Sequence, residues 1–339
     1  MNVTFRVDSS SKIGLGHIMR CMALADELKQ KGSRITFICR SLEGNIIESI
    51  QHKVVVLPNN NFQSDENSLR YLDLFQKQDA TETISSLPLN TDFLVVDSYL
   101  LNMEWHQELR NYTKKIMVID DLADRNFDCD LLLNQNLGFQ EKDYRGKVPN
   151  NCKLLLGSNY ALLRSEFSEK RKQALIKRQY TSKVKNILVS VGGSDINNVT
   201  YDILQELDYR FNVVVVLGKA SPHNELIKHY AKDKNIKVII NANNMAELML
   251  DADLAIGAGG STSWERCCLG LPTLLYVLAE NQMAISESLE DIGAVKIIRN
   301  LQQDLQSFID KPDLLNNISI NAKSACDGLG CKRVGEYVK

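Results

Sequence analysis

The sequence has no apolar run that approaches the roughly 20 residues needed to span a bilayer. Its first eight residues resemble a charged strand and lack the long apolar region of a signal peptide. A net charge of −2 leaves no basic excess of the kind that binds nucleic acid phosphates. We therefore expect a cytoplasmic protein whose partners include neither a membrane nor a nucleic acid. The sequence alone defines no oligomeric state.

Metal and ATP motifs are also missing. The eight cysteines include no C-x-x-C pair and no nearby histidine at the spacing of zinc ligands, so we expect buried thiols. Two Asp-x-Asp triplets, at residues 128–130 and 251–253, precede predicted strands, whereas ligand sites of α/β sheets follow them. The motif G-x-x-x-x-G-K-[S/T] is absent. The sequence therefore predicts no metal, no other cofactor and no ATP-hydrolysing machine.

The 339 residues have the composition of a globular protein, with 44% hydrophobic and 24% charged residues, and are long enough for about two domains. Strand-length apolar runs alternate with helix-length amphipathic segments, which is typical of doubly wound α/β proteins. The first half has predicted strands at residues 3–7, 35–39, 54–57, 93–96, 115–119 and 131–133, and predicted helices at 17–30, 45–51, 68–78 and 104–111. The second half has predicted strands at residues 186–191, 211–217, 236–240, 254–256 and 272–276.

A charged segment at residues 167–185 separates these two halves and resembles a solvated helix and linker. We therefore expect an α/β fold of two Rossmann-like domains, residues 1–166 and residues 186–339, joined by this linker. No shorter repeat is visible.

The first predicted strand leads through a glycine turn into a helix. The residues of interest there are Arg6, Asp8, Gly14, Gly16, His17 and Arg20. Amides at a helix start favour anions, and a near-neutral imidazole at that point can take a proton from water or a hydroxyl. Two glycines alone fit an ordinary tight turn equally well, but the polar groups at the carboxyl end of one strand favour a ligand site, with Asp8 as the partner of His17.

A nicotinamide-cofactor site fits this turn less well. Met19 occupies the third glycine position of the dinucleotide fingerprint, and the second strand runs into Arg40 instead of an acidic residue for a ribose.

The second half contains a nucleotide-binding pattern. Its fourth strand ends in the small residues Gly259, Gly260, Ser261 and Thr262, whose amides and hydroxyls can wrap a diphosphate. Glu265, one turn later, is placed to accept hydrogen bonds from two ribose hydroxyls. Gly193 and Ser194 form a similar turn after that half's first strand.

Several further polar residues follow predicted strands. Asp97 and Tyr99 are expected to contact a sugar, and Asn281 and Gln282 to border the sugar or phosphate. Arg164 either reaches the diphosphate or forms a surface ion pair. Asp120 and Asp121 either orient the sugar or cap a turn.

Nine sequence segments occur in the order found in one known family. They are residues 5–8, 13–20, 95–99, 119–122, 131–136, 157–167, 192–195, 257–265 and 279–282. Over nearly the whole chain these segments resemble the UDP-sugar hydrolases of pseudaminic acid biosynthesis. That family is similar to the GT-B glycosyltransferases, in particular the muramyl-lipid GlcNAc transferase, but uses water as the acceptor.

The resemblance implies two Rossmann-like domains that face each other across a cleft. It also implies cleavage of UDP-2,4-diacetamido-2,4,6-trideoxy-β-L-altropyranose to the free sugar and UDP without a metal, with His17 as the base. A related diacetamido sugar is the alternative substrate. The main rival function is a glycosyltransferase that moves the sugar to a hydroxyl, although residues 1–166 carry no clear amphipathic membrane helix. A nucleotide-sugar sensor without turnover is the third reading, which His17 disfavours.

Overall fold

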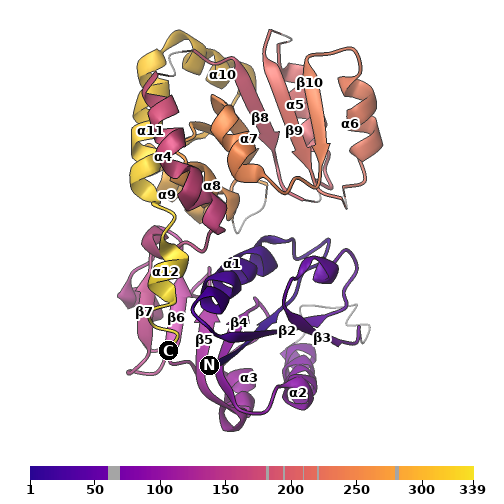
Figure 1. The fold of residues 1–339 in the computed structure, drawn as a ribbon, viewed down its shortest axis with the longest axis vertical. Coiled ribbons are helices and arrows are strands. Elements are labelled where there is room, and N and C mark those ends of the chain that lie inside the picture. The colour runs from indigo at the N-terminus through magenta and orange to yellow at the C-terminus, as the bar shows by residue number, and fades with distance from the viewer. Residues whose placement is uncertain (60–68, 181–182, 194, 209, 220, 279–281) are drawn as a thin grey trace. The chain divides into compact units, whose positions relative to one another are not determined.

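The computed structural model describes residues 1–59, 69–180, 183–193, 195–208, 210–219, 221–278 and 282–339. The chain forms two compact units (Figure 1). The first unit consists of Met1–Leu162 together with Gly330–Lys339, and the second unit of Leu163–Leu329. Each unit is built around one parallel sheet, which confirms the predicted α/β fold class.

The first unit contains a seven-stranded sheet in the order β3-β2-β1-β4-β5-β6-β7. Its strands are β1 (Asn2–Val7), β2 (Arg34–Arg40), β3 (Lys53–Leu57), β4 (Thr91–Asp97), β5 (Thr113–Ile119), β6 (Leu131–Asn134) and β7 (Lys153–Leu156). Its helices are α1 (Gly16–Gln30), α2 (Leu69–Ser86), α3 (Met103–Leu109) and α12 (Gly330–Val334), with 3-10 turns η1 (Ile47–Ser49), η2 (Arg110–Tyr112), η3 (Glu141–Tyr144) and η4 (Ser158–Tyr160). The strand order reverses between β1 and β4, and ligands bind at such switch points in open α/β sheets.

Apolar side chains on both faces of this sheet hold its helices. Along β4, Phe93 and Val95 belong to the apolar cluster under α1 and α12, whereas Leu94 and Val96 belong to the cluster under α2 and α3. The alternation follows from the two-residue period of a strand, and a continuous apolar run is typical of a parallel sheet buried on both faces. This packing fixes the register of β4 against β1, where Val7 pairs with Asp97.

The second unit contains a six-stranded sheet in the order β10-β9-β8-β11-β12-β13. Its strands are β8 (Asn186–Ser190), β9 (Asn212–Leu217), β10 (Ile236–Ile240), β11 (Leu254–Ala258), β12 (Thr273–Tyr276) and β13 (Lys296–Ile297). Its helices are α4 (Ser165–Tyr180), α5 (Val199–Glu206), α6 (Asn224–Ala231), α7 (Met245–Asp251), α8 (Thr262–Cys268), α9 (Met283–Asp291), α10 (Leu301–Asp310) and α11 (Pro312–Ala325). This strand order also reverses, between β8 and β11, so both units have the same plan.

The charged segment at residues 167–185 lies mostly in helix α4, which packs within the second unit. Arg171 donates to the carbonyl oxygens of Cys268 and Cys326, and Arg178 to those of Met249 and Ala252. The last carbonyl oxygens of a helix receive no hydrogen bond from within the helix, so cationic side chains can donate to them. The expectation of a solvated linker is therefore corrected: Arg171 and Arg178 of α4 bind the carbonyl oxygens at the ends of α7, α8 and α11.

The last ten residues return to the first unit, whereas the predicted boundary assigns residues 186–339 to the second and leaves the placement of the tail after Asp313 open. Val334 of α12 and Val338 are buried in the apolar cluster that includes α1. A Cβ on Gly330 would lie 2.1 Å from the carbonyl oxygen of Ala161, so this close approach requires glycine. The return is a packing effect that no periodic pattern in so short a tail indicates.

Short elements differ from the sequence expectations. Residues 45–51, predicted as a helix, form only the 3-10 turn Ile47–Ser49. Strands β7 and β13, of four and two residues, were not predicted. Such lengths are below what a two-residue period can define.

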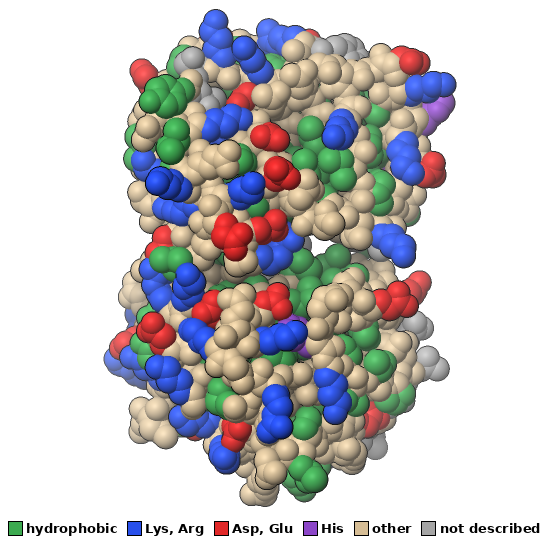
Figure 2. Space-filling model, viewed as in Figure 1, with side chains coloured by type: hydrophobic (Ala, Val, Ile, Leu, Met, Phe, Trp, Pro, Cys, Tyr) green, Lys and Arg blue, Asp and Glu red, His purple; other side chains and the backbone are tan. Residues whose placement is uncertain are grey.

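Surface charges of both signs alternate over the face of each unit that Figure 2 shows, in keeping with the net charge of −2. Among the described helices, none combines the length and the apolar character that crossing a membrane requires.

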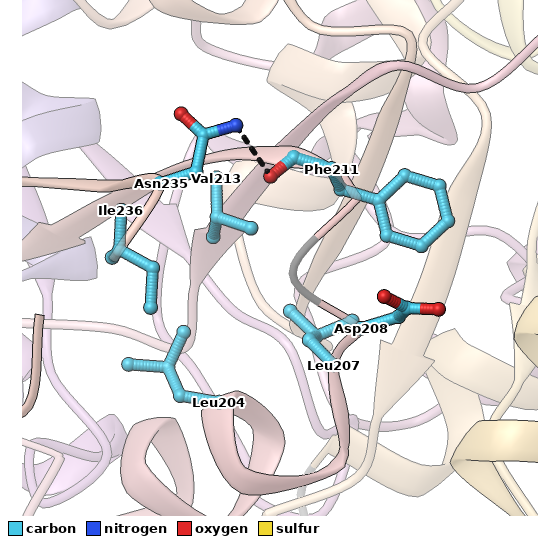
Figure 3. Close-up of a pocket in the computed structure, with 7 residues that line it drawn as sticks. All are labelled: Leu204, Leu207, Asp208, Phe211, Val213, Asn235 and Ile236. Atoms are coloured by element: carbon cyan, nitrogen blue, oxygen red, sulfur yellow. Dashed lines mark hydrogen bonds between the residues drawn. The ribbon is translucent and has the colours of Figure 1, made fainter. Parts of the chain in front are cut away.

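A small apolar cavity lies near the start of β9 and β10 (Figure 3). Its lining residues are Leu204, Leu207, Asp208, Phe211, Val213, Asn235 and Ile236. Its volume of about 10 Å³ is roughly the space that one water needs. We therefore treat it as a gap in packing and not as a ligand site.

Candidate active site

His17 follows a tight turn between β1 and α1. The Ser10 hydroxyl accepts hydrogen bonds from the backbone amides of Lys12 at 3.2 Å and Ile13 at 2.9 Å. The Ser10 carbonyl oxygen accepts one from the amide of Gly14. Gly14 has a φ of +83°, in the left-handed region that favours glycine. The contacts of Ser10 and the left-handed conformation of Gly14 thus form the turn that places His17 in the first turn of α1.

No side chain caps the start of α1. Within the described chain, the amides of Gly16, His17 and Ile18 have no hydrogen-bond acceptor. Unpaired amides at the positive end of a 15-residue helix favour an anion or a polar ligand.

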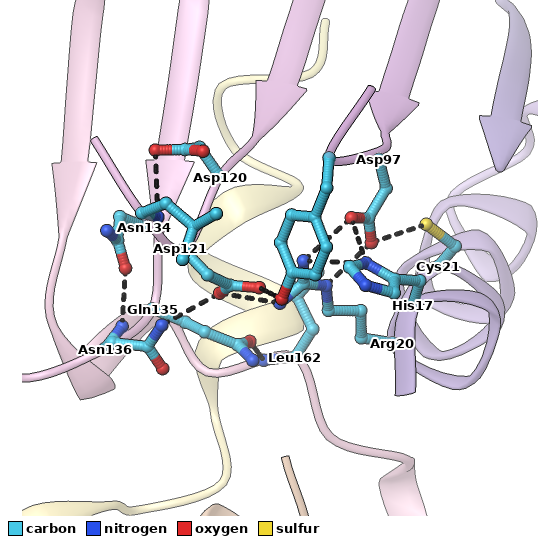
Figure 4. Close-up of polar contacts among 12 residues, drawn as sticks. His17, Arg20, Cys21, Asp97, Asp120, Asp121, Asn134, Gln135, Asn136 and Leu162 are labelled. Atoms are coloured by element: carbon cyan, nitrogen blue, oxygen red, sulfur yellow. Dashed lines mark hydrogen bonds and ion pairs between the residues drawn. The ribbon is translucent and has the colours of Figure 1, made fainter. Parts of the chain in front are cut away.

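Neighbouring strands bring polar side chains together at their carboxyl ends (Figure 4). His17 follows β1, Asp97 ends β4, Asp121 follows β5 and Asn136 follows β6. These four strands are adjacent in the sheet, although the residues are far apart in the chain.

Asp97 holds the imidazole of His17. Its Oδ1 lies 2.6 Å from His17 Nδ1, while Arg20 donates Nε–H to Oδ2 and Nη2–H to Oδ1, both at 2.7 Å. Burial opposes ionisation of Asp97, but the charges and hydrogen bonds of Arg20 and His17 outweigh it and hold the pKa of Asp97 below its usual value. An ionised Asp97 is an acceptor for Nδ1–H, which assigns the neutral imidazole the tautomer with a lone pair on Nε2.

The second ring nitrogen of His17, Nε2, has no hydrogen-bond partner among the described residues. The ring of Tyr99 packs edge-on against the imidazole, with centroids 4.6 Å apart and planes at 84°. The ring is thus fixed by Asp97 and Tyr99, and Nε2 can accept a proton.

Asp121 connects this group to β5 and β6. Its Oδ1 accepts from Arg20 at 2.9 Å and from Asn136 at 2.8 Å, and its Oδ2 accepts from the Tyr99 hydroxyl at 3.0 Å. Burial opposes ionisation of Asp121, but the charge of Arg20 lowers its pKa. Burial and the neighbouring Asp121 raise the pKa of Tyr99, which therefore remains a neutral donor.

Asp120 has a structural environment instead. It is fully buried, and its Oδ2 accepts from the Tyr144 hydroxyl and the Ala123 amide, both at 2.7 Å. Arg125 pairs with its Oδ1 at 3.1 Å, while burial raises its pKa. The sequence left two alternatives for Asp120 and Asp121, orienting the sugar or capping a turn. Turn capping fits Asp120, whereas Asp121 contacts Arg20 and Tyr99 beside His17.

Arg6 and Asp8 lie in a buried ion cluster. Arg6 donates to both carboxylate oxygens of Asp79, at 3.1 and 2.5 Å, and to Asp8 at 2.6 Å. The alternation of β1 directs Arg6 toward α2, away from the helix that carries His17. This corrects two expectations: Arg6 is occupied in the interior at 1% exposure, and Asp97 takes the place predicted for Asp8 as the partner of His17.

The predicted phosphate loop of the second unit joins β11 to α8. The amide of Gly259 donates to the carbonyl of Tyr276 at 3.0 Å, so it belongs to the sheet. The amides of Gly260, Ser261 and Thr262 have no acceptor in the described part of the chain, and a Cβ on Gly260 would meet open space. Three of the four predicted phosphate-binding residues therefore offer free donors.

Arg266, which the sequence did not single out, supports this loop. It is 2% exposed and donates to the Ala258 carbonyl at 2.7 Å and the Ser263 hydroxyl at 3.0 Å. Burial lowers its pKa to about 10. Gly257 makes room for it, because a Cβ there would lie 2.7 Å from its guanidinium.

Glu265 lies one turn into α8 with its side chain 15% exposed. Burial raises its pKa to about 7, with the charge of Arg164 acting in the opposite direction. Arg164 lies 3.6 Å from Glu265 and 2.8 Å from Glu166. The structure thus brings Arg164 and Glu265 together, with the guanidinium already paired to carboxylates.

The remaining predicted contacts are distributed around the same sheet. Gly193 follows β8. A Cβ on Gly218 would lie only 2.0 Å from the carbonyl oxygen of Gly193, so the two backbone segments approach closely. Gln282 precedes α9, and its Oε1 accepts the amide of Leu278 at 3.1 Å. Ser194 and Asn281 lie outside the described residues.

The carboxylates of Asp128, Asp130 and Asp253, from the two Asp-x-Asp triplets, are engaged by protein groups. Arg110 pairs with Asp128 at 2.8 Å and with Asp130 at 2.5 Å. Asp253 accepts the amides of Lys185 and Asn186. Within the described residues, no three histidine, cysteine or carboxylate side chains gather as metal ligands.

Comparison with known proteins relates this geometry to a family. The chain is 30% identical over 263 residues to the UDP-2,4-diacetamido-2,4,6-trideoxy-β-L-altropyranose hydrolase of Campylobacter jejuni, an alignment that covers 77% of this chain and 86% of the relative. The chain belongs to this hydrolase family. It is also 30% identical over 293 residues to an uncharacterised protein of Methanocaldococcus jannaschii, of whose length it spans 56%.

The second unit of this member of the hydrolase family has a wider relationship. A model of the glycosyltransferase family 28 C-terminal domain matches residues 186–322. The crystal structure of MurG from Acinetobacter baumannii has a TM-score of 0.66 and 15% identity, and covers 99% of both chains. This likeness shows the fold, and it confirms the predicted GT-B class.

Proposed function

We propose that this protein is a metal-independent, inverting hydrolase that cleaves UDP-2,4-diacetamido-2,4,6-trideoxy-β-L-altropyranose to UDP and the free sugar, in pseudaminic acid biosynthesis. Membership of the hydrolase family supports the substrate, which is the one in the name of the Campylobacter jejuni relative. The observation that carries the proposal is the imidazole of His17, which Asp97 holds at Nδ1 while Nε2 has no partner in the described chain.

The proposed reaction uses His17 as a general base. Nε2 takes a proton from a water molecule as the water oxygen attacks the anomeric carbon, and the bond from that carbon to the UDP oxygen breaks. Attack opposite the leaving group inverts the configuration. Asp97 stabilises the imidazolium that forms, and the electron pair of the broken bond leaves with UDP.

The proposed nucleotide contacts belong to the second unit. The free amides of Gly260, Ser261 and Thr262 would hold the diphosphate, so that the charge developing on the leaving group meets fixed donors. Glu265 would accept from the ribose hydroxyls. Further proposed contacts are Gly14, Gly16 and Tyr99 for the sugar, and Gly193, Arg164 and Gln282 for the nucleotide or sugar.

A glycosyltransferase is the second candidate, because the family 28 model matches residues 186–322. Such an enzyme would use the same base on an acceptor hydroxyl instead of water. The two functions therefore differ in the acceptor and not in the assignment of His17 or Glu265.

Incubation of the pure protein with the UDP-sugar and no acceptor is expected to release UDP and free sugar in equal amounts. NMR would report the first-formed anomer, which is expected to have the inverted configuration. A transferase would leave the UDP-sugar intact until a hydroxyl acceptor is added. UDP-N-acetylglucosamine serves as the matched control substrate, and its turnover at an equal rate would contradict the proposed specificity.

The Glu265→Ala variant is expected to bind UDP about 1.5–3 kcal/mol more weakly, the loss typical of a charged hydrogen-bond partner.

The affinity of the wild type for UDP is expected to depend on pH through Glu265. Below pH 7 the free protein carries a neutral Glu265, so binding that needs the carboxylate must expel a proton, and affinity falls as the pH drops through about 7. Isothermal titration calorimetry with UDP measures both effects.

Two controls separate Glu265 from other contributions. Glu265→Gln is uncharged at every pH, so the pH dependence that it retains belongs to UDP itself, whose phosphate titrates near pH 6. Glu225→Gln alters an exposed glutamate of α6 and is expected to leave affinity unchanged. Wild-type affinity in a folded Glu265→Ala protein would remove Glu265 from the site.

A further inference from the structure

Arg20 is positioned between two carboxylates and the imidazole. Its side chain is 5% exposed, and its Nη2 lies 3.2 Å from His17 Nδ1. It binds both oxygens of Asp97 and, through Nη1, Oδ1 of Asp121. Among the described residues, the titratable and charged groups around His17 are Arg20 and Cys21 from α1, Asp97 and Tyr99 from β4 and the residues after it, and Asp121 from the loop after β5.

Asp97 by itself would favour a protonated imidazole, because an opposite charge 2.6 Å away stabilises the cation. A ring that already carries the second proton cannot take one from water. The guanidinium of Arg20 acts in the opposite direction, since it neutralises Asp97 and places a like charge beside an imidazolium.

We propose that Arg20 and Asp121 are positioning residues that together set the charge balance at His17. The guanidinium of Arg20 offsets the charge of Asp97 beside the imidazole, and Asp121 holds Arg20 in place while it offsets part of that cation's effect. Asp121 also binds the Tyr99 hydroxyl, so it fixes the ring that packs against His17. This inference rests on the proposed function, because it explains how the base stays active, but it concerns a charge state that is measurable without turnover.

The charges predict opposite effects for two neighbouring variants. One guanidinium and the two carboxylates of Asp97 and Asp121 give the surroundings of His17 a net charge of −1. Arg20→Gln leaves the two carboxylates and a charge of −2, which favours the imidazolium, whereas Asp121→Asn leaves one of each sign and disfavours it. General damage to the site would not move the two variants in opposite directions.

The test is an NMR titration of the His17 Cε1–H resonance in the full-length chain, assigned by its loss in His17→Asn, together with the pH dependence of kcat and kcat/KM. Arg20→Gln is expected to move the titration midpoint and the acid limb of the rate profile to higher pH by about one unit or more. Asp121→Asn is expected to move both to lower pH. Arg20→Lys keeps the charge but loses the two-pronged geometry, so it should retain the midpoint and lower kcat.

Midpoints that stay unchanged, or that move in the same direction in Arg20→Gln and Asp121→Asn, overturn the proposal. Circular dichroism establishes that each variant is folded. If Arg20→Gln does not fold, Asp121→Asn alone decides, since anything but a downward shift contradicts the charge balance. Opposite shifts in a protein that turns over no UDP-sugar would reject the proposed function and leave this inference standing.

Discussion

The His17→Asn variant is expected to hydrolyse the UDP-sugar about 10²- to 10⁴-fold more slowly than the wild type, the usual contribution of a positioned general base. Asparagine keeps a polar side chain near Asp97 but has no nitrogen that takes up a proton. UDP affinity is expected to be nearly constant, because the proposed nucleotide contacts belong to the second unit. Steady-state kinetics and calorimetry with UDP measure the two quantities.

His52→Asn is the matched control for this variant. His52 also pairs with a carboxylate, Asp26 at 2.8 Å, but it lies just before β3 at the amino end of the sheet's strands. Its replacement is expected to leave turnover close to the wild-type value. Near-normal turnover in His17→Asn would end the case for the proposed mechanism.

Replacing Asp79 by alanine is expected to lower the free energy of unfolding of the first unit by about 3–5 kcal/mol, the cost of breaking a buried ion pair. Asp79 is fully buried and accepts from Arg6, from Arg40 at 2.6 Å and from the Trp105 indole at 3.0 Å. Burial opposes its ionisation, yet Arg6 and Arg40 lower its pKa to about 2. Its loss removes the shared counter-charge of two buried guanidiniums.

Asp92→Ala provides the comparison on the surface of the same sheet. Asp92 pairs at 2.6 Å with Lys114, whose side chain is 74% exposed, and such pairs contribute at most about 1 kcal/mol. Urea unfolding of both variants and the wild type gives the two differences. A loss in Asp79→Ala no larger than that in Asp92→Ala would contradict the role of the buried cluster.

The long strands were predictable because burial on both faces produces continuous apolar runs. The prediction of residues 93–96, for example, lies within β4 (Thr91–Asp97). The two-residue β13 and the return of α12 carry no such signal, since tertiary packing alone defines them. Helix α4 shows the opposite case, in which a charged pattern fits both a solvated helix and one that caps its neighbours.

The sequence identified His17 as the candidate base but not its partner. Asp8 directly follows β1 and Asp97 ends β4, and the sheet order that places β4 beside β1 brings Asp97 to His17 from 80 residues away. Arg6 was misplaced for a related reason: strand alternation turns it toward Asp79, 73 residues distant on α2. Local patterns identify which residues carry chemistry, whereas non-local packing decides which of them meet.

The return of α12 to the first unit has a consequence for synthesis on the ribosome. Domains generally fold as units, the N-terminal one first. Here residues 163–329 can complete the second unit before Val334 and Val338 have been made, and these two side chains fill the apolar cluster that includes α1. A nascent chain stalled before residue 330 would therefore hold a finished second unit and an unfinished first unit around His17, which inverts the usual order of maturation.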